Sequence, residues 1–153
     1  MDESELPFVD AHSIVLAAPT ELAWSALESY VNKSLDRIEL APIAWILGTK
    51  PRAGFAVEER MPPTRLALAG RHRFSRYRLV FTLTGTAGGT TQLKATTYAL
   101  FPGLHGRLYR ALVIGTRGHV LGVHHMLRSV ERTSRRLRAR SDADDEDAGS
   151  VPS

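Results

Sequence analysis

Along the first third of the chain, the spacing of apolar positions changes from that of a strand to that of a helix. Residues 8–18 are rich in apolar and β-branched side chains, which favours a first strand. Residues 19–31 begin with a proline, which suits the first turn of a helix. Their apolar stripe has helical spacing, is bordered by Trp24, and consists of Leu22, Ala23, Ala26, Leu27, Tyr30 and Val31. A short second helix at 32–40 and a short buried strand at 42–48 are expected to follow.

The middle of the chain alternates apolar and polar residues with the two-residue period of strands. The segments with this pattern are 54–61, 64–70, 76–85 and 90–101. In the first of them Glu59 falls on the apolar face, together with Phe55, Val57 and Met61. The glycine-rich stretch 86–90 is typical of a hairpin turn. The sheet is therefore expected to be mostly antiparallel.

The stretch 70–81, GRHRFSRYRLVF, combines arginines with aromatic residues, as a base-stacking surface for nucleic acid would. Before Ser75 the apolar residues occupy even positions, and after Ser75 they occupy odd positions. A continuous strand keeps its faces, so a turn or bulge is expected near 74–76. His72 is then the polar side chain on the inner face. The arginines are expected to point to solvent rather than to share a surface with the aromatic rings; they are Arg71, Arg73, Arg76 and Arg78.

From Pro102 onward the period becomes that of one long amphipathic helix. Its stripe consists of Leu108, Leu112, Gly115, His119, Gly122, Met126, Val130, Thr133 and Leu137. The other faces carry Arg107, Arg110, Arg117, Arg128, Arg132, Arg135 and Arg136. Each glycine inside a helix costs about 1 kcal/mol relative to alanine. The interior glycines therefore indicate a close approach, a bend or space left open; they are Gly115, Gly118 and Gly122.

Length and composition are those of one domain with a substantial core. The chain has 153 residues, 43% of them hydrophobic, and a single domain is expected over 7–140. It has no cysteine, which excludes disulfides and cysteine-ligated metal sites. The acidic segment 141–153 has Val151 as its one large apolar residue, so we expect a disordered, solubilising tail.

The distribution of charge restricts location and partners. The first residues are acidic and form no signal peptide, and no apolar run is long enough to span a membrane, so a cytoplasmic protein is expected. The net charge of +4 hides a more basic body, because acidic residues gather near both ends. A basic body admits nucleic acid, an anionic membrane or an anionic ligand as partner.

Candidates for catalysis are isolated side chains rather than motifs. His119 and His124 are five residues apart, so they diverge around a helix and do not form a zinc-binding pair. No metal and no cofactor is expected. His72, Glu59 and His119 are the candidate acid or base residues, because each is expected on an inner face. The structural alternatives are a satisfied core histidine and a glutamate that is turned outward by a bulge or paired with arginine.

Two segments carry a resemblance to a known family. The opening SIVLAAPTELAWSAL and the closing stretch FPGLHGRLYRALVIGTRGHVLGVHHMLRSVER resemble the START-like, birch-pollen-allergen-like (SRPBCC) superfamily, which includes polyketide cyclases and lipid-transfer proteins. The order of elements between them agrees, over about 8–138. The resemblance implies an α+β helix-grip fold, in which a curved antiparallel β-sheet is wrapped around a long C-terminal helix. It also implies an apolar cavity between sheet and helix; only some members are enzymes.

The expected function is therefore binding of an apolar or amphipathic small molecule, such as a lipid or polyketide-like compound, by a monomer or dimer. The residues expected to contact it are Trp24, Phe55, Val57, Glu59, His72, Tyr77, Phe81, Thr97, Tyr109, His119 and Met126. One alternative is a cyclase or dehydratase-type enzyme that uses an inward His or Glu as acid or base. Another is a basic module that binds nucleic acid or anionic membrane through the C-terminal helix. Since the chain contains no recognised nucleic-acid module, a solvated helix face is the simpler explanation of the arginines.

Overall fold

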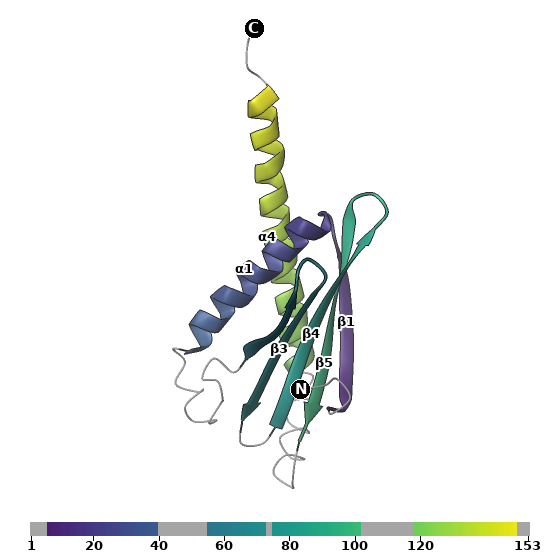
Figure 1. Cartoon of the computed structure of the whole chain (residues 1–153), viewed down its shortest axis with the longest axis vertical. Coiled ribbons are helices and arrows are strands. Elements are labelled where there is room, and N and C mark those ends of the chain that lie inside the picture. Colours follow the sequence, from purple (N-terminus) through teal and green to yellow (C-terminus); the bar gives the residue numbers. More distant parts are fainter. Residues whose placement is uncertain (1–5, 40–54, 73–74, 102–117, 150–153) are drawn as a thin grey trace.

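The computed structural model describes residues 6–39, 55–72, 75–101 and 118–149 (Figure 1). The elements follow the expected α+β order of a strand, a helical region, further strands and a long C-terminal helix. They are β1 (Phe8–Leu16), α1 (Thr20–Glu39), β2 (Ala56–Met61), β3 (Arg65–His72), β4 (Ser75–Thr86), β5 (Thr90–Leu100) and α4 (Gly118–Gly149). The strand expected at 42–48 lies outside the described residues.

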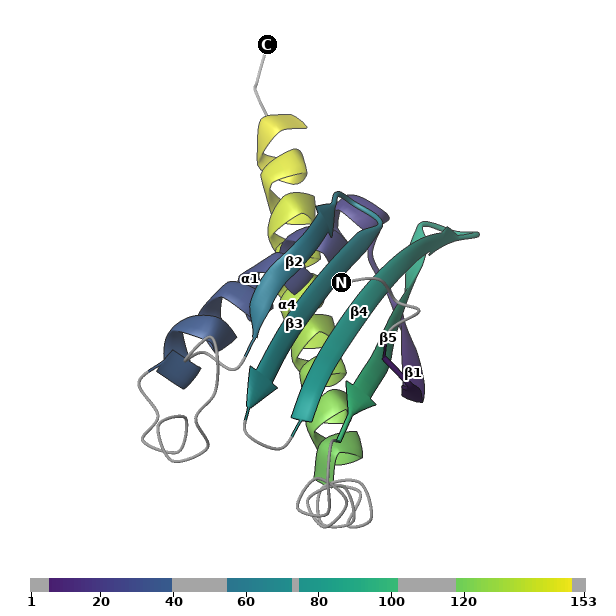
Figure 2. The ribbon, with the colours of Figure 1, turned by 60° about the horizontal axis from the view of Figure 1, so that its bottom comes forward.

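The strands form one curved antiparallel sheet in the order β1-β5-β4-β3-β2. Figure 2 shows α1 and α4 on the same side of this sheet, with α4 running behind it. We call this side the inner face and the opposite side the outer face. The expected fold class, a curved antiparallel sheet wrapped around a long C-terminal helix, is confirmed.

Two hairpins in the sheet match the sequence pattern. His72 pairs with Ser75, so the chain reverses direction between them, where the change of parity predicts a turn. The β4–β5 hairpin turns through Gly88 and Gly89, whose φ angles are +79° and +68°. Residues with a Cβ seldom adopt such angles, which explains the glycines at this turn. The two hairpins fix the register of β3, β4 and β5.

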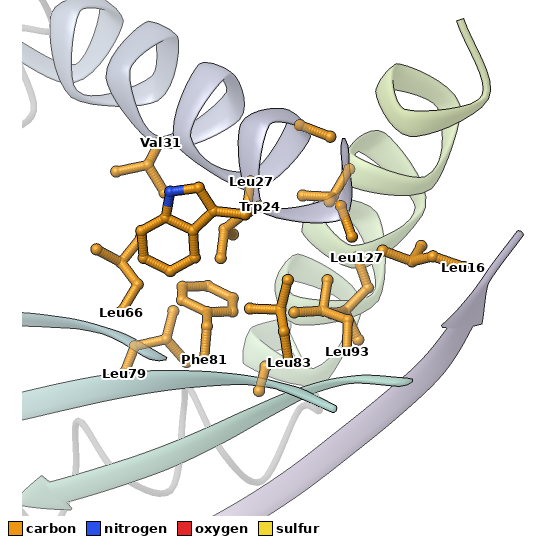
Figure 3. Close-up of a cluster of buried hydrophobic side chains, with 14 of the residues drawn as sticks. Leu16, Trp24, Leu27, Val31, Leu66, Leu79, Phe81, Leu83, Leu93 and Leu127 are labelled. Carbon is orange, nitrogen blue, oxygen red and sulfur yellow. The ribbon is translucent and has the colours of Figure 1, made fainter. Parts of the chain in front are cut away.

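Helix α1 is one 20-residue helix, so the separate second helix expected at 32–40 is wrong. Helix α1 contains no glycine or proline, and it continues past Val31 and Asn32 without a break. The predicted stripe is confirmed where it is most apolar, because Ala23, Ala26, Leu27 and Val31 are buried. The stripe packs onto apolar side chains that alternate along the inner face (Figure 3); in the sheet and α4 these are Leu16, Leu66, Leu79, Phe81, Leu83, Leu93 and Leu127.

The buried line of α4 differs from the predicted stripe. It follows Val123, Leu127, Val130 and Ser134. Gly122, which the prediction places on the stripe, is exposed, and an added Cβ there would meet no atom within 4 Å. Helix α4 contacts α1 as well as β1 and β5, so its buried face is centred between the two layers. Gly122 is therefore not explained by a close approach of another segment, because the space beside it is open.

Helix α4 extends beyond the body of the protein (Figure 1). It is helical as far as Gly149, whereas the composition predicts disorder from residue 141 onward. The side chains of 141–145 are exposed, so the helix continues here without burial. Each residue added to an existing helix forms one more backbone hydrogen bond, so extending a helix is easier than starting one. In addition, Arg138 and Asp142 lie one turn apart, with 4.0 Å between Nε and Oδ2. The domain boundary at residue 140 stays a prediction.

Candidate functional site

The inner face is divided into an apolar region and a polar end. Around Trp24 and Phe81 it is closely packed, and these two side chains are 6% and 0% exposed. Both belong to the core, so a role in contacting a ligand finds no support at these two positions. Along β1 the inward positions run from Leu16 and Ile14 to His12 and Asp10, which places the polar residues at one end. This polar end is the candidate site.

Three side chains form a contact chain from β1 to α4. The Nε2 atom of His12 lies 2.9 Å from Oδ2 of Asp10, and the two side chains are 22% and 21% exposed. The His12 ring also contacts the ring of His124 on α4, with 4.8 Å between centroids and a 57° angle between planes. An imidazole held by a carboxylate has a defined orientation and tautomer. The arrangement therefore presents an oriented histidine between sheet and helix.

Thr97 adds a hydroxyl group to this end of the inner face. It lies on β5 directly opposite Asp10 in the β1–β5 pairing. Its Oγ1 is buried, and among the described residues no hydrogen-bond partner reaches it. Buried hydroxyl groups usually have a partner, because leaving one unpaired is costly. Among the predicted ligand-contact residues whose side chains are described, Thr97 thus has a buried hydroxyl group without a partner.

Aromatic and aliphatic side chains lie on the same face further along the sheet. Phe55 and Tyr77 meet edge to face, with ring centroids 4.8 Å apart. Gly70 pairs with Tyr77 in the adjacent strand and presents no side chain between the two rings. Val57 and Met126 pack against the edge of the core and remain half-buried, as do Phe55 and Ile14. These positions supply apolar surface that is not fully enclosed by the described part of the protein.

The expectation that Glu59 points inward is wrong. A β-bulge between Val57 and Glu59 inserts one residue, so Glu59 pairs with Ala67, which is an outer-face position. On that face the Glu59 carboxylate accepts hydrogen bonds from Arg65 and Arg78, each at 3.2 Å. A carboxylate held in this way by two arginines stabilises the sheet and cannot contact a ligand on the inner face. Of the two structural alternatives for Glu59, the bulge and the arginine partners both apply.

The expectation that every arginine of 70–81 points to solvent is also wrong for one residue. Arg78 is on the outer face, as predicted, but its side chain is 6% exposed because two glutamates cover it. Its Nε lies 2.7 Å from Oε2 of Glu58, which makes an ion pair. The angle at this nitrogen does not meet the requirement of a hydrogen bond. Arg71 and Arg76 are exposed as predicted.

Three predicted site residues cannot be judged at the level of the side chain. His72 is the last residue of β3, and His119 is the second residue of α4, but their side chains are outside the described part of the structure. Tyr109 lies outside it entirely. Among the side chains that are described, no group of three or more His, Asp or Glu residues could hold a metal ion.

The sequence reasoning missed Asp10, His12 and His124. A signal for the first two exists, because they share the even positions of β1 with Ile14 and Leu16 and therefore share their face. His124 carries no such signal. It lies one residue beyond Val123 on α4 and is exposed, yet its ring reaches the edge of the sheet at His12.

The described arginines of α4 are mostly solvated. Those with exposed side chains are Arg128, Arg132, Arg135, Arg136, Arg138 and Arg140. Three of them also bind within the protein. Arg132 donates to the hydroxyl of Ser129 at 3.1 Å, Arg135 pairs with Glu131 at 2.6 Å, and Arg138 donates to the backbone oxygen of Ala17 at 2.6 Å. Binding of nucleic acid or anionic membrane through this helix stays a prediction. Within the described ranges, no helix combines the length and apolar character needed to cross a membrane.

Comparison with known proteins supports the fold and nothing finer. No family model and no curated protein matches the sequence. Among solved structures, a conserved protein from Geobacillus kaustophilus has a TM-score of 0.52 at 17% identity, covering 86% of this chain and 95% of that one. A protein from Mesorhizobium loti has a TM-score of 0.51 at 17% identity, covering 83% and 98%. An HSP90 activator from Plasmodium falciparum has a TM-score of 0.39 at 17% identity, covering 73% and 96%, too low to carry an argument.

The chain therefore shares a sheet-plus-C-terminal-helix fold with bacterial proteins of similar length. At this level of identity the similarity shows the fold alone. Membership of the START-like superfamily stays an interpretation, supported by the fold.

Proposed function

We propose that the protein binds an apolar or amphipathic small molecule between the sheet and α4, at the polar end of the inner face. The observation that carries the proposal is the Thr97 hydroxyl, which is buried and has no hydrogen-bond partner among the described residues. An unpaired buried hydroxyl costs roughly 1–3 kcal/mol. A ligand that supplies the missing hydrogen bond would recover this free energy in the bound state.

The inner side of the sheet has the composition of a ligand site. Such sites are mainly apolar and carry a few polar groups that orient the ligand. Ile14 and Val57 on the sheet and Met126 on α4 are apolar and half-buried, and the Asp10–His12 pair beside Thr97 is polar and partly accessible. An amphipathic molecule would place its apolar body against the apolar side chains and its polar group against the Asp10–His12 pair.

Binding can be tested by titrating the full chain with the neutral fluorescent probe N-phenyl-1-naphthylamine. We expect saturable binding at about one molecule per chain. Thr97→Leu, which fills space at the polar end, should weaken binding at least tenfold. Thr96→Leu is the matched control, because Thr96 is the neighbouring residue on the outer face and should leave binding unchanged. Absence of saturable binding by the wild-type chain would reject the proposal, as would equal weakening by both variants.

The hydrogen bond between Asp10 and His12 favours acid–base catalysis as a second candidate. A carboxylate-oriented histidine is a common general base. In a cyclase-type reaction, His12 would accept a proton from an acidic C–H group of the ligand, and the electron pair of that bond would move to the adjacent carbonyl. The test is exchange of the acidic protons of benzoylacetone for deuterium, followed by NMR. The wild-type chain should accelerate exchange and His12→Phe should not; equal rates would exclude this role.

A further inference from the structure

The hydrogen bond at His12 determines which ring nitrogen is available. Oδ2 of Asp10 lies 2.9 Å from Nε2 of His12, and an ionised carboxylate only accepts hydrogen bonds. Nε2 must therefore carry the hydrogen, which leaves the lone pair of the neutral imidazole on Nδ1. No described residue provides a hydrogen-bond partner for Nδ1. His12 thus presents an acceptor at the polar end of the inner face.

The neighbouring groups complement that acceptor. Across the strand pair, opposite Asp10, the Thr97 hydroxyl can donate one hydrogen bond. The His124 ring packs beside His12, with 4.8 Å between ring centroids, and restricts the directions from which a ligand can approach. The Asp10 carboxylate places a negative charge within one hydrogen bond of His12.

From this geometry we infer that the site selects ligands whose polar group is a hydroxyl, either an alcohol or a phenol, over ligands with the same apolar body that end in a carboxylate. The ligand hydroxyl donates its hydrogen to Nδ1 of His12, and its oxygen accepts a hydrogen bond from Thr97. Every donor then meets an acceptor. A carboxylate has no hydrogen to donate, so its oxygen would face the lone pair of Nδ1. This inference rests on the proposed ligand binding and adds the chemical class of the ligand.

Asp10 acts in this scheme as a positioning residue. In Asp10→Asn the side-chain amide can either accept a hydrogen bond from Nε2 of His12 or donate one to it. Both tautomers of His12 are then satisfied, so Nδ1 is no longer held as an acceptor. The variant is therefore expected to lose part of the preference for the hydroxyl ligand. A role of Asp10 in folding alone would change the affinity for both ligands without changing their ratio.

The test measures the affinities of naphthalene, 2-naphthol and 2-naphthoate by calorimetry with the full chain at pH 8. The wild-type chain should bind 2-naphthol at least about tenfold more tightly than 2-naphthoate, in line with the cost of an unmade hydrogen bond. His12→Phe keeps a ring but removes Nδ1, so the ratio should approach one. His125→Phe is the matched control, because His125 is an exposed histidine next to His124 and should leave the ratio unchanged.

The outcomes separate this inference from the proposed function. Equal affinity of the wild-type chain for 2-naphthol and 2-naphthoate, or a preference for 2-naphthoate, overturns the hydroxyl selectivity and leaves ligand binding intact. Failure of all three naphthalene compounds and of N-phenyl-1-naphthylamine to bind overturns the proposed function itself. If the Asp10 and His12 variants do not fold, the wild-type ratio alone decides.

Discussion

The guanidinium of Arg78 lies under two carboxylates on the outer face of the sheet, 2.7 Å from Glu58 and 3.2 Å from Glu59. Glu59 also binds Arg65, so these four side chains form one ionic network across β2, β3 and β4. The network covers Ala67 and Val80, which are outer-face residues and are nonetheless buried. Its members hold the edge strand β2 onto the rest of the sheet.

Removing the charge of Arg78 should destabilise the protein. Arg78→Gln removes the cation that Glu58 and Glu59 share, although Glu59 keeps its ion pair with Arg65. Breaking a buried pair typically costs 3–5 kcal/mol. Because Glu58 and Glu59 keep 23% and 31% of their side-chain surface exposed, we expect a smaller loss of about 2 kcal/mol. Arg76→Gln, on the same strand and face but exposed, should change stability by less than about 0.5 kcal/mol. Urea unfolding of both variants measures the difference, and equal losses would show that the network contributes nothing.

Replacing Thr97 by valine should make the unliganded protein more stable. The two side chains have nearly the same shape, and valine removes the buried hydroxyl that has no partner among the described residues. We expect a gain of about 1 kcal/mol in the free energy of unfolding, with weaker ligand binding. Thr96→Val controls for the strand propensity of valine. A loss of stability in Thr97→Val relative to this control would mean that the hydroxyl is already satisfied within the protein.

Leu121 and Leu127, two of the leucines of α4, should respond differently to truncation. Leu127 is fully buried against the core, whereas Leu121, less than two turns earlier, is 70% exposed. Leu127→Ala is expected to cost 2–5 kcal/mol, because it removes buried apolar surface and leaves a cavity. Leu121→Ala should cost less than about 0.5 kcal/mol. Thermal unfolding followed by circular dichroism measures both, and a large effect at Leu121 would reveal a contact that the described structure does not contain.

Removing residues 141–153 should lower the helical content of the protein but leave its free energy of unfolding nearly unchanged. Helix α4 continues through 141–149, but the side chains of 141–145 are exposed. A chain that ends at Arg140 should lose helical signal in far-ultraviolet circular dichroism while its free energy of unfolding changes by less than about 0.5 kcal/mol. An unchanged helical signal would support the disordered tail that the composition predicts. A marked loss of stability would instead indicate that the tail packs on the domain.

The elements of the fold were predictable because each buries one face. The apolar stripe of α1 and the change from even to odd apolar positions at Ser75 both result from burial of one side of an element. The structure has the helix and the β3–β4 pairing where these patterns predict them. The end of α1 was not predictable in this way. Polar residues after Val31 resemble a break, but a helix on a protein surface can continue with polar residues as long as its backbone bonds are made.

The candidate site was only partly predictable, and Glu59 shows the reason. Alternation assigns a face by counting residues, so one inserted residue reverses every assignment that follows it. The bulge between Val57 and Glu59 reverses the assignment of Glu59 in this way, and the periodic pattern of the sequence does not predict the bulge. Strand β5 has no shift between Thr90 and Thr97, so counting residues along it places Thr97 on the inner face, where the structure has it. His124 depends on the rotation of α4 about its axis, which packing against α1 decides.

The two interrupted strands have a consequence for how the molecule meets its neighbours. Within the described part of the chain, β1 and β2 form the two margins of the sheet, and both contain a register shift, one between Phe8 and Asp10 and one between Val57 and Glu59. A shift bends the strand and breaks the even row of backbone groups that another extended chain would need for pairing. The same irregularity that turns a glutamate away from the interior therefore also protects the molecule against strand-by-strand aggregation.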